Sequence, residues 1–269
     1  MDQRAIGVFD SGLGGLTAVR EIRRILPDEN IVYFGDTARV PYGGRSREML
    51  LKYARQDMNF LRGFDLKAVV IACGTVSTTA LDALKQENDI PVIGVVEPAC
   101  RRAVELTVNR KVGLIATQAS IRSGAYERKI AELDPSIKVF GISCPLFVPL
   151  VEAGRFSPED IVVDTIAREY LQPLQQTKVD TLILGCTHYP LLTQAIGTIM
   201  GPGVSLVDVG SQAAFALRML LERENMLAPK RQGKAEYYVS DRPEDFERIG
   251  SLFLRETLPA AQKVDIEQY

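Results

Sequence analysis

The sequence predicts an α/β fold of two similar lobes, each built around a mostly parallel sheet. Short apolar runs alternate with helix-length amphipathic segments, a pattern typical of parallel strands with helices on both faces of the sheet. The pattern then repeats, because the apolar runs of the second half follow those of the first with an offset of roughly 105 to 115 residues. The length of 269 residues is sufficient for two such lobes with proper cores.

Eight strands are expected, four in each half of the chain. They are the apolar runs bounded by turn residues or polar side chains, namely Ala5–Phe9, Ile31–Phe34, Ala68–Ala72, Val92–Val96, Val112–Ala116, Lys138–Phe140, Thr181–Leu184 and Ser205–Val207. Between them we expect helices, among them one from about Ser77 to Gln86. Another should open at Pro190, where proline is favourable because its missing N–H is not needed.

The repeat divides the chain into two lobes and a tail. We expect the first lobe to hold residues 1–96 and the second to hold residues 97–208. The remaining segment, 209–269, does not fit the repeat: a long helix and a polar linker precede a strand-like run at Glu236–Ser240 and a helix at Pro243–Glu256. We expect this tail to return and to pack on the first lobe.

Composition excludes several classes of protein. Hydrophobic residues make up 46% and charged residues 25%, with a net charge of −2, so there is no general tendency to bind nucleic acid or membranes. The N-terminus has no signal-peptide pattern and no apolar stretch could span a bilayer, so we expect a cytoplasmic protein. The four cysteines should then be free thiols, and they lack the spacing of a zinc site.

Two of the cysteines follow predicted strands at equivalent places in the two halves. Cys73 is followed closely by Thr75, and Cys186 is followed by Thr187 and His188, the single histidine of the chain. A cysteine is often only a small buried apolar residue, but two in the same setting favour a function. A helix that begins beside a thiol would also lower the pKa of the thiol.

Further polar residues collect where strands end. In open α/β sheets ligands bind beyond the carboxyl ends of the strands, and the residues found there, besides the two cysteine motifs, are Asp10, Ser11, Asp36, Thr37 and Thr117. If a pseudo-twofold axis relates the lobes, the two thiols meet from opposite sides of one cleft. We therefore expect the active site in the cleft between the lobes.

The segment Asp10–Leu16 is a glycine-rich turn from a strand into a helix. Its backbone N–H groups could cradle an anion, and Asp36 lies at a distance suited to hold a ribose. The glycine spacing is GxGG rather than GxGxxG, however, which disfavours a dinucleotide. A small ligand with a carboxylate and an ammonium group, the latter held by Asp10, fits better. A glycine-rich packing turn is the remaining alternative.

Two loops and two cysteines are less informative. Pro41–Gly44 follows the second strand, and its spacing also fits an ordinary turn. The apolar loop Ser143–Glu152 ends in a carboxylate that points either to solvent or into the cleft. Cys100 and Cys144 lack the strand–Cys–Thr setting, and we interpret both as structural.

Together these motifs resemble those of the glutamate racemases, in the cofactor-independent aspartate/glutamate racemase superfamily. The matching motifs occur in order along essentially the whole chain: FDSGLGG at Phe9–Gly15, YFGDTARVPYG at Tyr33–Gly43, IAC at Ile71–Cys73, PLFVPLVE at Pro145–Glu152 and LGCTHYPLL at Leu184–Leu192. The CTHYP form points to glutamate racemases, whereas aspartate racemases usually have CTE. One departure is Gly74, where the family usually has the asparagine of CNTA. The missing amide removes a potential hydrogen bond to substrate.

The resemblance implies that Cys73 and Cys186 are the two acid/base residues, assisted by Asp10, Glu152 and His188. The residues that it implies in substrate contact are Asp10, Ser11, Tyr42, Gly43, Gly74, Thr75, Thr117, Thr187 and His188. It further implies an enzyme without a cofactor that supplies D-glutamate for peptidoglycan, and homodimers, which family members often form.

The residues themselves are compatible with this chemistry. Two bases on opposite faces of Cα can racemise an amino acid without rotating it, and no lysine stands at a strand end in the setting that pyridoxal phosphate needs.

Two alternative functions remain open. One is a racemase of aspartate or another amino acid on the same scaffold. The other is a two-lobe protein that binds an amino acid without chemistry, against which the paired thiols and the missing signal segment argue.

Overall fold

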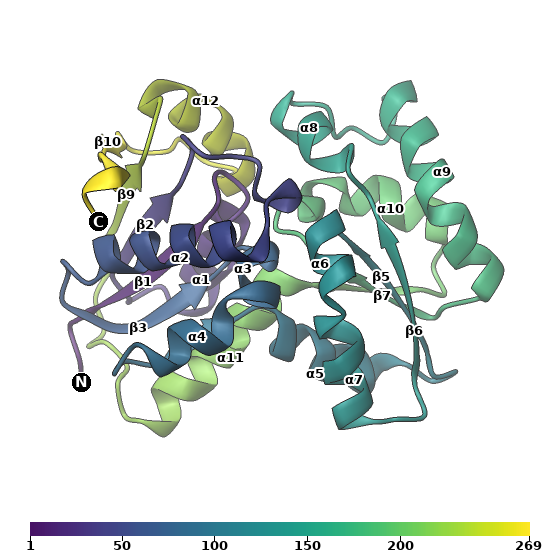
Figure 1. Cartoon of the computed structure of the whole chain (residues 1–269), viewed down its shortest axis with the longest axis horizontal. Coiled ribbons are helices and arrows are strands. Elements are labelled where there is room, and N and C mark those ends of the chain that lie inside the picture. The colour runs from purple at the N-terminus through teal and green to yellow at the C-terminus, as the bar shows by residue number, and fades with distance from the viewer.

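The computed structural model describes residues 1–269 and contains two parallel sheets, each with helices on both faces. The sheets lie side by side, in the left and right halves of Figure 1. This arrangement confirms the predicted α/β class with two mostly parallel sheets. No helix combines the length and the apolar character that a crossing of a membrane requires.

The first sheet has six strands in the order β10-β9-β2-β1-β3-β4. Their bounds are Ala5–Asp10 (β1), Ile31–Gly35 (β2), Leu66–Ile71 (β3), Val92–Gly94 (β4), Ala235–Val239 (β9) and Gln262–Lys263 (β10). The central strands are apolar and buried along almost their whole length, because helices cover both faces of the sheet.

The second sheet has four strands in the order β6-β5-β7-β8. Their bounds are Lys111–Ala116 (β5), Lys138–Ser143 (β6), Thr181–Leu184 (β7) and Ser205–Asp208 (β8). In both sheets the first strand lies between the second and the third, and the fourth follows the third, so the internal repeat extends to strand order. All eight predicted strands are present; β4 is shorter than predicted because Val96 already begins a helix.

Twelve helices connect and cover the strands. They are Leu16–Ile25 (α1), Arg47–Leu61 (α2), Gly74–Thr79 (α3), Leu81–Gln86 (α4), Val96–Leu106 (α5), Gln118–Ser123 (α6), Ala125–Leu133 (α7), Phe147–Glu152 (α8), Ile161–Thr177 (α9), Thr193–Met200 (α10), Val209–Arg223 (α11) and Pro243–Leu254 (α12). Short 3-10 turns are Tyr42–Gly44 (η1), Tyr189–Leu192 (η2) and Ile266–Gln268 (η3). Side-chain caps by Ser46, Asp160 and Asp208 fix the starts of α2, α9 and α11.

Three local predictions were wrong. The helix predicted from Ser77 to Gln86 begins earlier and is broken at Ala80, next to the point where the hydroxyls of Thr78 and Thr79 bond to the carbonyl of Thr75. The segment at Pro190 is a 3-10 turn, and the α-helix begins only at Thr193. The predicted apolar loop before Glu152 contains the helix α8.

The tail closes one side of the first sheet. Strand β9 pairs in parallel with β2, and β10 extends the sheet by one more strand. Two hydrogen bonds tie the end of β9 to the segment after β2: Ser240 Oγ donates to Asp36 Oδ1 (2.8 Å), and Thr37 Oγ1 donates to the carbonyl of Asp241 (2.6 Å). The segment that leads to η1 is therefore held by residues 204 positions later in the chain.

Candidate active site

A cavity of about 430 Å³ lies between the lobes, where β1, β3, β5 and β7 end. This volume suits a small molecule. All of the residues predicted as site residues line it: Asp10, Ser11, Tyr42, Gly43, Cys73, Gly74, Thr75, Thr117, Glu152, Cys186, Thr187 and His188. The fold thus brings both strand–Cys–Thr motifs to one place, although they are more than 100 residues apart in sequence.

At the Cys186 side, one imidazole joins the thiol to a carboxylate. The sulfur of Cys186 lies 3.8 Å from Nδ1 of His188, and Nε2 of His188 lies 2.9 Å from Oε1 of Glu152. Burial alone would lower the pKa of His188, but the interactions with Cys186 and Glu152 outweigh burial and raise this pKa to about 10. His188 is therefore an imidazolium at neutral pH.

At the Cys73 side, the thiol is almost fully buried. Its sulfur donates to Ser11 Oγ at 3.6 Å. Burial, together with the nearby Asp10 carboxylate, raises the pKa of Cys73 to about 12. Burial therefore outweighs any effect of the short helix α3 that begins beside this thiol. Cys73 is a neutral thiol at neutral pH.

Asp10 connects the two lobes at the floor of the cavity. Its Oδ2 accepts from the N–H of Gly12 (3.0 Å), and its Oδ1 accepts from the hydroxyl of Thr187 (3.4 Å). Burial raises the pKa of this carboxyl group. The carboxylate therefore touches the second-lobe loop that carries Cys186 as well as its own turn.

The glycine-rich turn both lines the cavity and packs against the second lobe. Only Asp10 and Ser11 of this turn line the cavity, and a Cβ at Gly14 would overlap the hydroxyl of Thr187 and the ring of His188. Gly14 therefore serves packing, while the interpretation that Asp10 and Ser11 hold a small ligand stays a prediction. Asp36, the candidate ribose ligand, is fully buried.

Two hydroxyls meet across the cleft. Thr75 Oγ1 and Thr117 Oγ1 are 3.1 Å apart, one from each lobe. Gly43 faces the same Thr117, whereas the hydroxyl of Tyr42 bonds to the buried carboxylates of Asp36 and Asp57. The hydroxyl of Tyr42 is thus already engaged, and Tyr42 can offer a ligand only its backbone or the edge of its ring.

Gly74, in the first cysteine motif, lies against the backbone of the second cysteine motif. A Cβ at this position would lie 2.6 Å from the carbonyl oxygen of Gly185 and 4.0 Å from Cα of Cys186. The asparagine that the family usually has here would not fit in this arrangement. The glycine lets the backbones that carry the two thiols approach each other.

Several cavity residues were missed by the sequence analysis. They are mostly apolar or small, namely Val40, Pro41, Gly44, Gln118, Cys144, Pro145, Val148, Pro149 and Gly185. Such residues carry no chemical signature, although the apolar segment before Glu152 was a usable signal for a hydrophobic wall. Cys144 lines the cavity but remains buried, and burial raises the pKa of this thiol.

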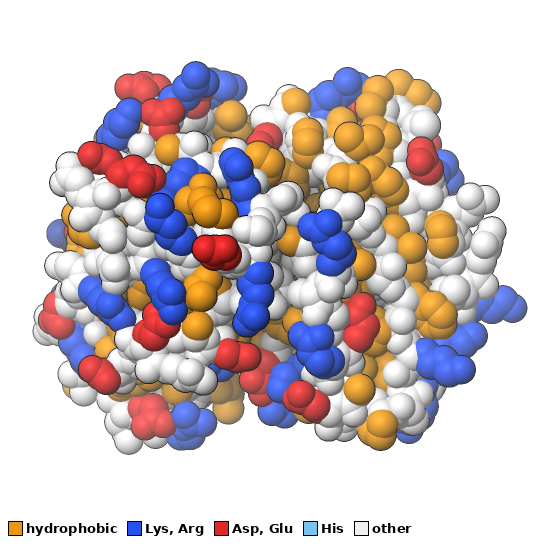
Figure 2. Space-filling view, in the orientation of Figure 1, with side chains coloured by type: hydrophobic (Ala, Val, Ile, Leu, Met, Phe, Trp, Pro, Cys, Tyr) orange, Lys and Arg blue, Asp and Glu red, His pale blue; other side chains and the backbone are white.

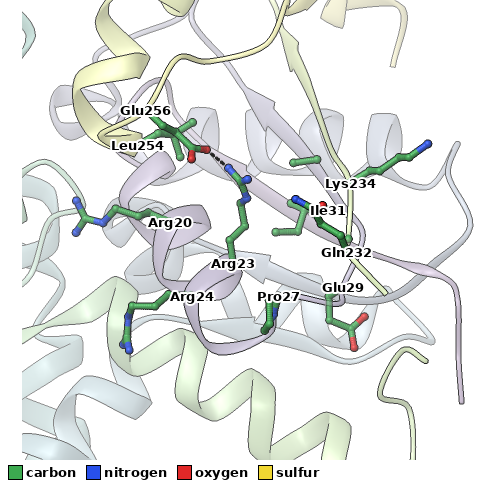
Figure 3. A pocket seen from close by; sticks show the side chains of 12 residues that line it. Arg20, Arg23, Arg24, Pro27, Glu29, Ile31, Gln232, Lys234, Leu254 and Glu256 are labelled. Carbon is green, nitrogen blue, oxygen red and sulfur yellow. Dashed lines mark hydrogen bonds and ion pairs between the residues drawn. The ribbon is translucent and has the colours of Figure 1, made fainter. Parts of the chain in front are cut away.

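A smaller hollow of about 280 Å³ lies beside α1 on the first lobe (Figure 3). Figure 3 shows its arginine side chains pointing in different directions, with Arg23 paired to Glu256. Arg20 and Arg24 both pair with Glu21. We assign no ligand to this hollow because its three arginines already pair with carboxylates. No group of three or more His, Cys, Asp or Glu side chains is arranged to hold a metal ion.

Comparisons with known proteins agree with this geometry. The family model described as Asp/Glu/Hydantoin racemase matches residues 17–217. A glutamate racemase of Geobacter metallireducens is 46% identical over 268 residues, which cover 99% of this chain and 98% of that protein.

Two solved structures are similar in fold and sequence. Glutamate racemase isoform RacE1 from Bacillus anthracis has a TM-score of 0.94 at 38% identity, covering 98% of each chain. Glutamate racemase from Francisella tularensis, in complex with D-glutamate, has a TM-score of 0.93 at 39% identity, covering 100% of each chain. The resemblance inferred from the motifs is confirmed, and the chain belongs to the Asp/Glu/hydantoin racemase family of enzymes.

Proposed function

We propose that this enzyme is a glutamate racemase that interconverts L- and D-glutamate with two thiols. One thiol takes the proton from one face of Cα, and the other returns a proton to the opposite face. The observation that carries the proposal is the position of Cys73 and Cys186, which come from opposite lobes and line one cavity. The CTHYP motif and the similarity to glutamate racemases favour glutamate over other amino acids as the substrate.

The two thiols differ in their surroundings in a way that suits the first step. Racemisation needs one thiolate and one thiol at the start, and Cys73 supplies the thiol because its pKa is about 12. Cys186 lies beside the imidazolium of His188, a setting that is common next to reactive thiolates. By the resemblance, Cys186 faces the α-proton of L-glutamate, so the free enzyme is ready for the conversion of L- to D-glutamate.

Three side chains assist the thiols in this proposal. Glu152 holds His188 in its charged form and in its orientation, as their 2.9 Å contact indicates. Asp10 lies near Cys73 and is the carboxylate that assists this thiol in the proposal, because Glu152 bonds to His188. Asp10 also lines the cavity, where its carboxylate can attract the ammonium group of the substrate.

The main obstacle to racemisation is that the Cα–H group of the substrate is a far weaker acid than any thiol. The enzyme must stabilise the developing carbanion by fixed dipoles in a site from which water is excluded. The hydroxyls of Ser11, Thr75 and Thr117 and the backbone at Gly43 and Thr187 are in place to hold the carboxylates of the substrate. Closure of the lobes would remove the remaining water.

The biological setting is proposed from the resemblance. We propose that the enzyme acts in the cytoplasm without a cofactor, forms homodimers and supplies D-glutamate for peptidoglycan. We also propose that residues 1–96 with 209–269 and residues 97–208 form the two domains that close on the substrate. The continuity of β9 with the first sheet supports this division.

Circular dichroism of purified protein with L- and D-glutamate, without added pyridoxal phosphate, tests the proposal. We expect the signal of either enantiomer to decay to that of the racemate, and deuterium from solvent to appear at Cα. L-Aspartate and other amino acids serve as comparison substrates. Faster decay with another amino acid would assign a different substrate, and binding without deuterium uptake would favour the non-catalytic alternative.

A further inference from the structure

The loop Cys186–His188 belongs to the second lobe, but residues of the first lobe hold it in place. The hydroxyl of Thr187 donates to Asp10 (3.4 Å), and the ring of His188 packs nearly at right angles to that of Phe253 in α12, with 5.4 Å between the ring centres. The loop is thereby enclosed: His188 is only 5% exposed, and the face drawn in Figure 2 shows no histidine side chain. One further contact, from α1, reaches the backbone of the loop.

The carbonyl of Thr187 has no donor within its own turn. Its neighbours on both sides accept from the residue three positions later. The carbonyl of Cys186 accepts from the N–H of Tyr189 (3.1 Å), and the carbonyl of His188 accepts from the N–H of Leu191 (3.2 Å). The corresponding position for Thr187 is a proline, which has no N–H. Because a buried carbonyl without a partner is costly, this one needs a donor from outside the turn.

Thr17 supplies that donor across the boundary between the lobes. Its Oγ1 lies 2.9 Å from the carbonyl oxygen of Thr187 and 2.9 Å from that of Gly14. The carbonyl of Gly14 already accepts from the N–H of Thr17 (3.0 Å), so the single hydroxyl proton is free for Thr187. Thr17 is fully buried in the first turn of α1 and does not line the cavity. It can therefore influence a substrate only through the loop.

We propose that Thr17 is a positioning residue for the proton transfer at Cys186, a role that rests on the proposed function. Thr187 stands between the thiol and the imidazole in the chain, so the hydrogen bond to its carbonyl fixes the backbone that carries both groups. The bond thereby holds the sulfur of Cys186 at its distance of 3.8 Å from His188 and at one place relative to the first lobe. Cys73 follows β3 of the first lobe itself, so its position does not depend on this bond.

The proposal predicts an effect on one thiol only, which racemisation of glutamate does not reveal. Enantiomers have equal free energies, so any loss of kcat/KM is the same in both directions. With β-chloroalanine, the thiolate takes the α-proton, the electron pair of the Cα–H bond forms the Cα=Cβ bond, and chloride leaves with the electrons of the C–Cl bond. Water then converts the product to pyruvate and ammonia. Since this elimination is not reversed, each isomer reports on the thiol that it faces.

Thr17→Val removes the donor with little change of shape, whereas Thr17→Ser keeps it. For Thr17→Val, we expect the initial rate of pyruvate release from β-chloro-L-alanine to fall roughly 10-fold, because a hydrogen bond is lost and the base is displaced. The rate with the D-isomer should change by less than about 2-fold, and Thr17→Ser should resemble the unmodified protein with both isomers. If Thr17→Val folds poorly, Thr17→Ala is compared with Thr17→Ser in its place.

Thr193→Val is the matched control for these variants. The hydroxyl of Thr193 donates to the carbonyl of Pro190 (2.8 Å), so the same substitution removes the same kind of bond a few residues along the chain. This bond lies within the second lobe, and Thr193 does not line the cavity. The control variant should therefore process both isomers as the unmodified protein does.

The ring of His188 provides a readout that needs no catalysis. It is the single histidine of the chain, so its NMR signals are unambiguous in protein without a histidine tag. Its interactions with Cys186 and Glu152 raise its pKa to about 10, and displacement of the loop weakens these interactions. We expect His188 to titrate at lower pH in Thr17→Val, and at its usual pH in Thr17→Ser and in the control variant.

Three results would overturn the proposal: an unchanged rate of Thr17→Val with the L-isomer, an equal loss with both isomers, or the same loss in Thr193→Val. An equal loss would indicate that Thr17 supports the fold as a whole. Racemisation of glutamate by the unmodified protein is measured separately. If that protein neither racemises glutamate nor eliminates chloride, the proposed function fails. The titration of His188 then decides alone whether Thr17 holds the loop, because a shift supports this role and an unchanged titration contradicts it.

Discussion

Nε2 of His188 lies 2.9 Å from Oε1 of Glu152, while Nδ1 of the same ring faces the sulfur of Cys186 at 3.8 Å. Cys73, in contrast, has the carboxylate of Asp10 nearby. The cavity thus offers a positive charge to one thiol and a negative charge to the other. This asymmetry underlies the first two predictions.

Glu152→Gln should lower the pKa of His188, because the substitution removes a negative charge that favours the imidazolium. We expect kcat/KM to fall by roughly 10-fold, about 1.4 kcal/mol of transition-state stabilisation, and the alkaline limb of the pH profile to move to lower pH. Steady-state rates from pH 6 to 10 measure both effects. Glu169→Gln, at an exposed position on α9, is the control and should leave the profile unchanged. An unmoved profile for Glu152→Gln would show that this carboxylate does not act through His188.

His188 should also make stability depend on pH. Its pKa rises from 6.5 to about 10 in the folded protein, so the folded state binds more protons than the unfolded state between these values. Its contribution to the free energy of unfolding is therefore fully present below pH 6.5 and is lost as pH rises through 10. Urea unfolding of the unmodified protein and of His188→Asn at several pH values measures this contribution. The stability advantage of the unmodified protein should shrink across that window, and a constant advantage would contradict the assigned charge.

Replacing either active-site thiol should stop racemisation but leave a reaction on one face of Cα. Cys73→Ser and Cys186→Ser should each lose roughly 100-fold or more in rate, because a hydroxyl is a far poorer base. With β-chloroalanine, abstraction by the remaining thiol is followed by loss of chloride. We expect Cys73→Ser to process only the L-isomer and Cys186→Ser only the D-isomer, as measured by pyruvate release.

The control for the thiol variants is Cys100→Ser, which should stay active, because Cys100 is buried in α5 and does not line the cavity. Cys144 is a less suitable control, since it lies in the cavity wall. If both active-site variants attacked the same enantiomer, the assignment of the two thiols to opposite faces would be wrong.

Gly74→Asn should impair the enzyme even though it restores the usual family residue. The new Cβ would lie 2.6 Å from the carbonyl oxygen of Gly185, so the lobes would have to move apart. We expect a higher KM for glutamate and a loss of roughly 1–3 kcal/mol in the free energy of unfolding, as for overpacked sites. Gly203→Ala is the control, because a Cβ there meets no atom within 4 Å. Tighter glutamate binding by Gly74→Asn would mean that the close approach of Gly74 and Gly185 is not needed for activity.

The elements that the sequence predicted well are those whose signal is local. Each central strand is an uninterrupted apolar run because both faces of the sheet are covered, and such a run is readable without knowing its neighbours. The candidate site was also readable, because parallel strands of a repeat deliver equivalent positions, such as Cys73 and Cys186, to one cavity.

The features that were missed depend on contacts between distant segments. Whether Gly14 cradles an anion or packs against Thr187 is decided by the position of the second lobe. Whether the side chain of Glu152 points to solvent or into the cleft likewise depends on its contact with His188, which lies 36 residues later in the chain. The break at Ala80 reflects competition for hydrogen bonds that helix propensity does not describe. The domain boundaries, the homodimer and the cytoplasmic location stay predictions.

The attachment of the tail to the segment after β2 has a consequence for synthesis of the protein. Strand β9 and Ser240 support the segment that leads to Tyr42 and Gly43, yet they are synthesised about 200 residues after that segment. We expect a nascent chain stalled before residue 235 to have both sheets largely formed but an unfinished cavity wall. Ligand binding by such stalled chains, followed as their length increases, should begin only when the tail has emerged from the exit tunnel.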